Sequence, residues 1–165
     1  MPQELPETMP PVEPVQQALP LNLPEILTLH LEVLVTPELD QLIYDLCITA
    51  IEGGINYWCT VYSRRNFHTY GGPEGNVLIE DLQGFKAYLK HDDGTGKDII
   101  THFIILQGLT RLAEGKALFG GQPWKTGDLI KKCQAAFFCP EQADFDASDA
   151  DNIVQVGLFG DVVYG

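Results

Sequence analysis

The sequence predicts an α+β protein, in which a small antiparallel sheet is packed by about three helices behind an extended, proline-rich N-terminal lead. Some segments alternate apolar and polar residues with the period of a strand, and others place apolar residues three or four positions apart, as a helix does. The 165 residues are about the length of one ordinary domain. We therefore expect a lead at residues 1–24 and a single α+β domain at residues 25–165.

The lead is defined by its prolines. Residues 1–24 contain seven of the eleven prolines in the chain, a density at which neither a helix nor a central strand can form. Leu19, Leu21 and Leu23 alternate with other residues near its end. We expect an extended or disordered segment whose last part lies along the domain or along a partner.

Two elements are predicted directly after the lead. Residues 26–35 place leucines and valines on one face and polar residues on the other, the pattern of a half-buried strand. Thr36 then offers an N-cap, and Pro37 suits the first position of a helix. Apolar residues follow at helical spacing, and we expect this helix to end at Gly53 and Gly54.

The remaining elements complete the sheet and its helices. Aromatic and β-branched residues predict a strand at 55–62, and two more strands are predicted at 77–80 and 85–90. Asp92, Asp93 and Gly94 supply turn chemistry, which favours antiparallel pairing. Helices are expected at 99–114 and 148–159, and residues 116–143 are expected to be irregular apart from a short helix at 128–137.

The formal net charge of −13 is unevenly distributed along the chain. Residues 1–63 carry nine acids and residues 133–165 carry six, both without Lys or Arg, whereas residues 64–132 carry ten bases against eight acids. Such a chain repels nucleic-acid backbones and anionic membranes and is attracted to basic protein surfaces, although the charge can equally serve solubility alone. The predicted partner-binding residues are Glu38, Asp45, Asp144, Asp146, Asp149 and Asp151.

No motif predicts a metal, a cofactor or a catalytic residue. The four histidines share no ligand spacing, and there is no GxSxG sequence around a serine. Asp144, Asp146 and Ser148 begin a calcium-loop pattern, but Asp149 and Gln155 stand where that loop requires Gly and Glu. We therefore expect no metal and no cofactor.

Location and redox state follow from composition. The first residues carry acids where a signal peptide carries Lys or Arg, and no apolar stretch is long enough to span a bilayer. Cys47 and Cys59 lie in apolar patterns in which free cysteine packs as a small hydrophobe. The sequence thus predicts a cytoplasmic protein with reduced thiols.

A second candidate site follows the first helix. Glu52, Asn56 and Trp58 flank two glycines, and Arg64 and Arg65 precede an aromatic and glycine-rich stretch. These residues could together form a pocket that grips a phosphate and stacks a base. The alternative is a glycine C-cap followed by aromatic core residues, with the two arginines at an ordinary exposed strand end.

Two segments, EGGINYW at 52–58 and LFGDVVYG at 158–165, resemble those of small uncharacterised proteins encoded by tailed bacteriophages. The resemblance covers about 110 residues from the first helix onward and does not include the lead. It implies no catalytic residues. It implies the cytoplasm of an infected bacterium, where small acidic phage proteins often bind and disable host enzymes.

Three functional hypotheses follow. The first is a non-enzymatic phage accessory protein that binds and inhibits a host protein with a basic surface, such as a nucleic-acid-binding defence component, through acidic surface. It includes no direct binding of nucleic acid and none of membrane. The second is a sponge for a small nucleotide-like ligand, and the third is an enzyme whose site is assembled only in the folded chain.

Overall fold

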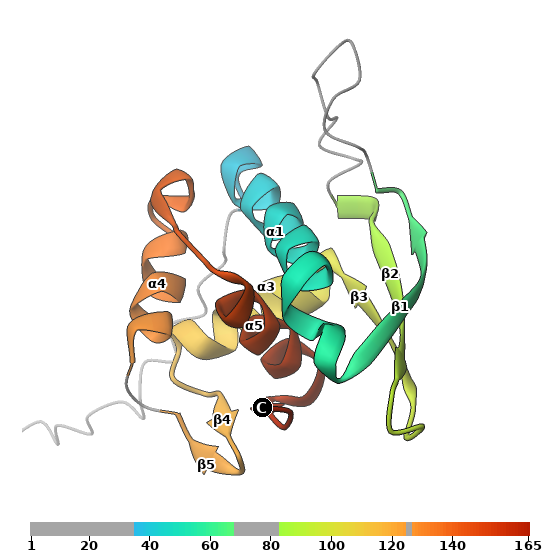
Figure 1. Cartoon of the computed structure of the whole chain (residues 1–165). Helices are drawn as coiled ribbons and strands as arrows, with labels where there is room; N and C mark the ends of the chain where they lie inside the picture. The colour runs from blue at the N-terminus through green and yellow to red at the C-terminus, as the bar shows by residue number, and fades with distance from the viewer. Residues whose placement is uncertain (1–34, 68–82, 125–126) are drawn as a thin grey trace, which may run out of the picture. The chain divides into compact units, whose positions relative to one another are not determined.

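The computed structural model describes residues 35–67, 83–124 and 127–165, and these residues have the predicted α+β architecture (Figure 1). They form four α-helices and two small three-stranded sheets. The predicted lead, the strand at 26–35 apart from Val35, and the strand at 77–80 lie outside the described residues.

The first helix, α1 (Pro37–Thr49), begins where the sequence predicts. The Thr36 hydroxyl accepts a hydrogen bond from the Leu39 amide at 3.2 Å, as an N-cap does. The helical path continues through a π-helical turn, η1 (Ala50–Gly54), and a 3-10 turn, η2 (Ile55–Tyr57). α1 gives way to a π-helical turn that ends at Gly54, as predicted, and the 3-10 turn follows, in which Ile55 is fully buried and its carbonyl accepts the Trp58 amide at 3.2 Å.

The predicted strand at 55–62 begins later than expected, because Ile55–Tyr57 belong to η2. The strand is β1 (Cys59–Arg65), and it pairs antiparallel with β2 (Lys86–His91), which in turn pairs antiparallel with β3 (Lys97–Thr101). A β-bulge lies between Val61 and Ser63. The predicted strand at 85–90 is confirmed with a shift of one residue.

The predicted helix at 99–114 is wrong at its start. Ile99 and Ile100 belong to β3, and the helix is α3 (His102–Ala113), with Thr101 as its N-cap. The error has a physical cause: β-branched residues suit both a buried strand and the apolar stripe of a helix, and pairing with β2 decides between them.

The C-terminal third contains both predicted helices, α4 (Asp128–Ala136) and α5 (Ala147–Phe159), joined through a 3-10 turn, η3 (Pro140–Gln142). Its second sheet was not predicted. The strands of that sheet are two residues long, too short for any alternation to be recognised: β4 (Leu118–Phe119), β5 (Gln122–Pro123) and β6 (Asp161–Val162). β4 lies between its partners, antiparallel to β5 and parallel to β6.

The centre of the core is the crossing of α3 and α5, which share the most extensive contact between helices of the described chain (Figure 1). Gly108 and Gly157 make this crossing close. A β-carbon at Gly108 would collide with the Ile153 carbonyl, and one at Gly157 would collide with the Ile104 carbonyl. Among the described residues no helix is long and apolar enough to cross a membrane.

We predict that Gly157→Ala lowers the free energy of unfolding by about 2 kcal/mol or more, because the added methyl group would push the two helices apart. Gly53→Ala is the control, since a β-carbon there lies 3.2 Å from the Ala147 side chain, a contact that a small shift relieves. Urea unfolding of both variants would test this. A smaller loss for Gly157→Ala than for Gly53→Ala would contradict the account of the crossing.

The cysteines give a second prediction. Cys47, Cys59 and Cys133 are buried free thiols, and Cys139 is exposed. Burial raises the pKa of Cys59 and of Cys133 to about 12. At pH 8 we expect one thiol per chain to react rapidly with Ellman's reagent, and four in denaturant, with Cys139→Ser removing the rapid phase. Rapid reaction of two or more thiols in the folded protein would contradict the burial.

Candidate functional site

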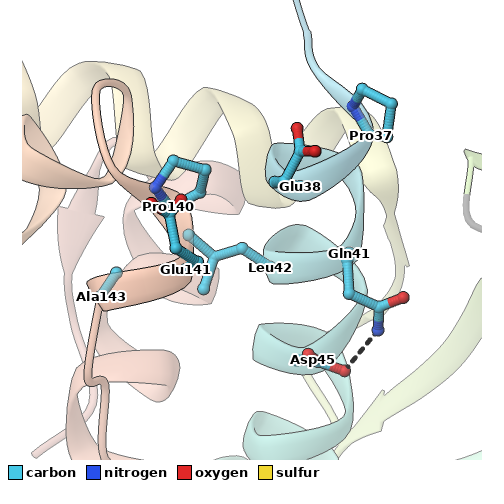
Figure 2. Close-up of a pocket in the computed structure, with 8 residues that line it drawn as sticks. All are labelled: Pro37, Glu38, Gln41, Leu42, Asp45, Pro140, Glu141 and Ala143. Carbon is cyan, nitrogen blue, oxygen red and sulfur yellow. Dashed lines mark hydrogen bonds between the residues drawn. The ribbon is translucent and has the colours of Figure 1, made fainter.

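A pocket with a volume of about 440 Å³ lies between α1 and the segment that contains η3 (Figure 2). Figure 2 shows Leu42 pointing from α1 towards Pro140 and Glu141 on the facing segment. The residues that line the pocket come from two parts of the chain: Pro37, Glu38, Gln41, Leu42, Asp45, Pro140, Glu141 and Ala143. We call this the acidic pocket.

The acidic pocket combines three carboxylates, Glu38, Asp45 and Glu141, with apolar surface from two prolines and Leu42. Gln41 donates a hydrogen bond to the Asp45 carboxylate at 2.9 Å. Among the described residues that line the pocket, none is basic. An arginine or lysine side chain has the complementary chemistry, with an apolar stem and a cationic end.

The charge of Glu38 is maintained by its position at the start of α1. Backbone N–H hydrogen bonding, followed by the Thr36 hydroxyl, lowers the pKa of the Glu38 carboxyl below its ordinary value. Glu38 is fully exposed, so its carboxylate is available to a partner. Glu38 therefore keeps its negative charge to a lower pH than an ordinary glutamate.

The other predicted partner-binding acids lie at the start of α5, and the structure gives them different roles. Asp144 is exposed. Asp146 and Asp149 form a capping box, and Asp149 also forms an ion pair with Lys132 at 2.6 Å. Asp151 is buried, with 4% of its surface exposed, so it does not belong to an acidic surface.

The Asp151 carboxylate is instead the acceptor of a buried hydrogen-bond network. The Trp58 indole N–H donates to Oδ1 at 2.7 Å. Oδ2 lies 2.7 Å from the Tyr57 hydroxyl and accepts from the Gln155 amide at 2.9 Å. Gly54 permits this approach of η1 to α5, since a β-carbon there would lie 2.6 Å from the Ala147 carbonyl oxygen.

The network continues into the C-terminal segment. Gln155 Oε1 accepts from the amides of Val163 and Tyr164 at 2.9 and 2.8 Å. The Tyr164 ring stacks on Trp58, with the ring centroids 4.8 Å apart and the planes 2° from parallel. The segments 52–58 and 158–165 therefore meet at one place in the fold.

Tyr57 is the network member closest to solvent. Burial of its hydroxyl, followed by the hydrogen bond to Asp151, raises the pKa of Tyr57 to about 12. Because the folded chain holds the neutral phenol more strongly than the unfolded chain, this contribution to stability is complete below pH 10 and is lost as the pH rises to about 12. Beside it lies a cavity of about 270 Å³, lined by Tyr57, Trp58, Asp92, Asp93, Tyr164 and Gly165.

The structure does not bring the residues of the second predicted site together. Trp58 is buried, whereas Asn56 is exposed and donates to the Glu52 carbonyl at 3.3 Å. Arg64 and Arg65 lie at the far end of β1, about 20 Å along an extended strand from Trp58. They also point to opposite faces, because Arg64 pairs with the buried Ala87 and Arg65 with the exposed Lys86.

Sequence reasoning missed several residues that the structure makes important. Glu141 was not selected because it lies in a stretch expected to be irregular, and only its packing against α1 completes the acidic pocket. Tyr57, Gln155 and Tyr164 carry no motif of their own. Tyr57 and Tyr164 lie in the segments 52–58 and 158–165 that the sequence analysis singles out, whereas Gln155 lies outside both.

Comparisons of this chain with models of protein families, with curated proteins and with solved structures find no match. Within the described ranges, no three His, Cys, Asp or Glu side chains form a group that could hold a metal ion. The chemistry of the chain's own surfaces, above all of the acidic pocket, therefore indicates its function.

We predict that Asp151→Ala lowers the free energy of unfolding by about 3 kcal/mol, because buried donors of Trp58 and Gln155 lose their acceptor. Trp58 emission in a Trp124→Phe background would report on the network during urea unfolding. The exposed Asp144→Ala is the matched control and should change stability by less than about 0.5 kcal/mol. Equal stability of the two variants would show that the network contributes little.

Proposed function

We propose that this chain is a non-enzymatic accessory protein of a tailed bacteriophage that binds and inhibits a host protein through acidic surface. The observation that carries the proposal is the acidic pocket, where three carboxylates line one concavity with apolar walls. The proposed partner presents a basic surface with at least one protruding arginine or lysine.

The chemistry of the pocket favours arginine in particular. A guanidinium group offers five N–H donors in a planar fork, so it can bond two carboxylates at once, while its stem packs against apolar surface. Glu38 and Glu141 are exposed and lie on opposite sides of the pocket, on α1 and η3. The proposal assigns them to the two sides of such a guanidinium.

The overall charge supports capture of a basic protein. At a net charge of −13, the chain attracts cationic surfaces over distances up to the Debye length, about 8 Å at physiological ionic strength. This attraction speeds association, and the pocket would add specificity at short range. A nucleic-acid-binding host protein has the basic surface that the proposal requires.

The nucleotide-sponge hypothesis receives less support. Asp92 and Asp93 line the cavity beside Trp58 and Tyr164, and no basic residue of the described ranges does, so these residues would repel a phosphate. Its aromatic rings are already stacked on each other. We therefore do not carry this hypothesis forward.

We predict that the immobilised full chain captures a host protein from bacterial lysate at 50 mM NaCl, and that capture weakens steeply towards 500 mM. The double variant Glu38→Gln/Glu141→Gln should lose at least about tenfold in affinity for the captured protein, because two charge-assisted hydrogen bonds are removed. Purified partner and titration calorimetry would measure this loss.

The control is Glu52→Gln/Asp128→Asn, which removes the same two charges from exposed positions outside the pocket. It should retain affinity within about twofold. If both double variants weaken binding equally, binding depends on the net charge of the chain and not on the acidic pocket. If no partner is captured at low salt, or capture is insensitive to salt, the proposed function fails.

A further inference from the structure

The outer face of the β1–β2–β3 sheet collects basic and aromatic side chains in an otherwise acidic protein. Along β2, alternate residues are buried against the helices, so Lys86, Tyr88 and Lys90 point away from the core. Arg65 lies opposite Lys86, and Lys97 lies opposite Lys90. Because residues opposite each other share a face, four cations lie on this side, and we call them the basic sheet face: Arg65, Lys86, Lys90 and Lys97.

Two tyrosine rings lie among these cations. The β-bulge places Tyr62 and Ser63 together opposite Tyr88, so both tyrosines are on the outer face. Their ring centroids are 6.2 Å apart, and the Tyr62 residue is 55% exposed. The Arg65 guanidinium carbon lies 5.4 Å from the Tyr88 ring centroid, and the Lys97 amine lies 5.8 Å from that of Tyr62.

Among the described residues, no carboxylate forms an ion pair with any of the four cations. Asp98 lies opposite the buried Leu89, so it points to the other side of the sheet, and its carboxylate is 2.8 Å from His91 Nε2. At the hairpin turn Asp93 accepts from Thr95 at 2.6 Å, and Asp92 accepts at 2.9 Å from Thr60, which pairs with Lys90. One carboxylate therefore lies at the Lys90 end of the basic sheet face.

We propose that the basic sheet face binds single-stranded nucleic acid. Phosphates would pair with Arg65, Lys86, Lys90 and Lys97, and unstacked bases would lie on the exposed ring of Tyr62 and beside the half-buried ring of Tyr88. An acidic peptide would match the cations but would leave the rings unused. A single strand uses both features, since every base offers a planar surface for stacking.

The net charge of −13 does not oppose this binding at ordinary salt. Charges beyond about 8–10 Å are largely screened at 0.1–0.15 M ionic strength, so a ligand at the surface responds mainly to the nearest groups. The predicted repulsion of nucleic acid follows from the net charge of the whole chain. The basic sheet face carries a positive local charge.

Fluorescence anisotropy of a labelled twenty-residue oligothymidylate, titrated with the full chain at 50 mM NaCl, tests the proposal. We expect saturable binding that weakens with salt. Four phosphate contacts would give a slope of about −3 in a plot of log affinity against log salt concentration, from about −0.7 per contact. The slope therefore gives the number of cationic side chains that contact phosphates.

Two matched double variants locate the site. Lys90→Gln/Lys97→Gln should weaken binding at least about tenfold and reduce the salt slope by about half. Lys116→Gln/Lys131→Gln removes the same charge from exposed lysines outside the sheet and should change affinity by less than about twofold. Tyr62→Leu should weaken binding by roughly tenfold without changing the salt slope, because it removes stacking but no charge.

Three results would overturn the proposal. They are the absence of saturable binding at 50 mM NaCl, equal weakening by the two lysine double variants, and polyglutamate competing as well as unlabelled oligothymidylate while Tyr62→Leu binds normally. The last result would identify the face as a site for acidic peptides. Because Glu38→Gln/Glu141→Gln leaves this face intact, it should still bind the oligonucleotide, which separates this test from that of the acidic pocket.

Discussion

Asp151 is the group on which the arrangement of three separate segments depends. A carboxylate removed from water is costly unless hydrogen bonds compensate it. Here Tyr57 at the end of η2, Trp58 directly after it and Gln155 in α5 provide these bonds. Gln155 then holds the backbone of Val163 and Tyr164. These hydrogen bonds hold the segment between α1 and β1 against α5 and the C-terminal segment.

The hydrogen bonds of Asp151 connect the elements that carry the acidic pocket and the basic sheet face. α1 carries one side of the acidic pocket, and β1 contributes Tyr62 and Arg65 to the basic sheet face. The connection between them runs through η1 and η2, whose position is set by the close approach of Gly54 to α5 and by the contacts of Trp58. Asp151 belongs to neither surface. Its loss would nevertheless be expected to make the position of the acidic pocket relative to the basic sheet face less fixed.

Most helices and strands could be predicted from local sequence patterns. Neither proposed surface could be predicted without the folded structure. Thr36 and Pro37 located the start of α1, and the helical spacing of apolar residues located α5 to within one residue. The strand identity of Ile99 and Ile100 did not follow, because only pairing with β2 distinguishes it from a helix. Likewise, Glu141 reaches the acidic pocket, and Lys86, Lys90 and Lys97 join Arg65, through contacts between segments far apart in sequence. Asp151 looked like one more surface acid, since its burial depends on donors more than ninety residues away.

The charge pattern has a consequence for how this protein meets other molecules. The acidic pocket lies on the side of α1 that faces η3, and the basic sheet face turns away from the helical core. The described part of the chain thus carries the acidic pocket and the basic sheet face on different elements. In the field of a basic protein or of a polyanion the molecule experiences a torque, so it would arrive at the two kinds of partner in different orientations. A ternary complex, with a basic protein on one side and a nucleic-acid strand on the other, is compatible with that geometry.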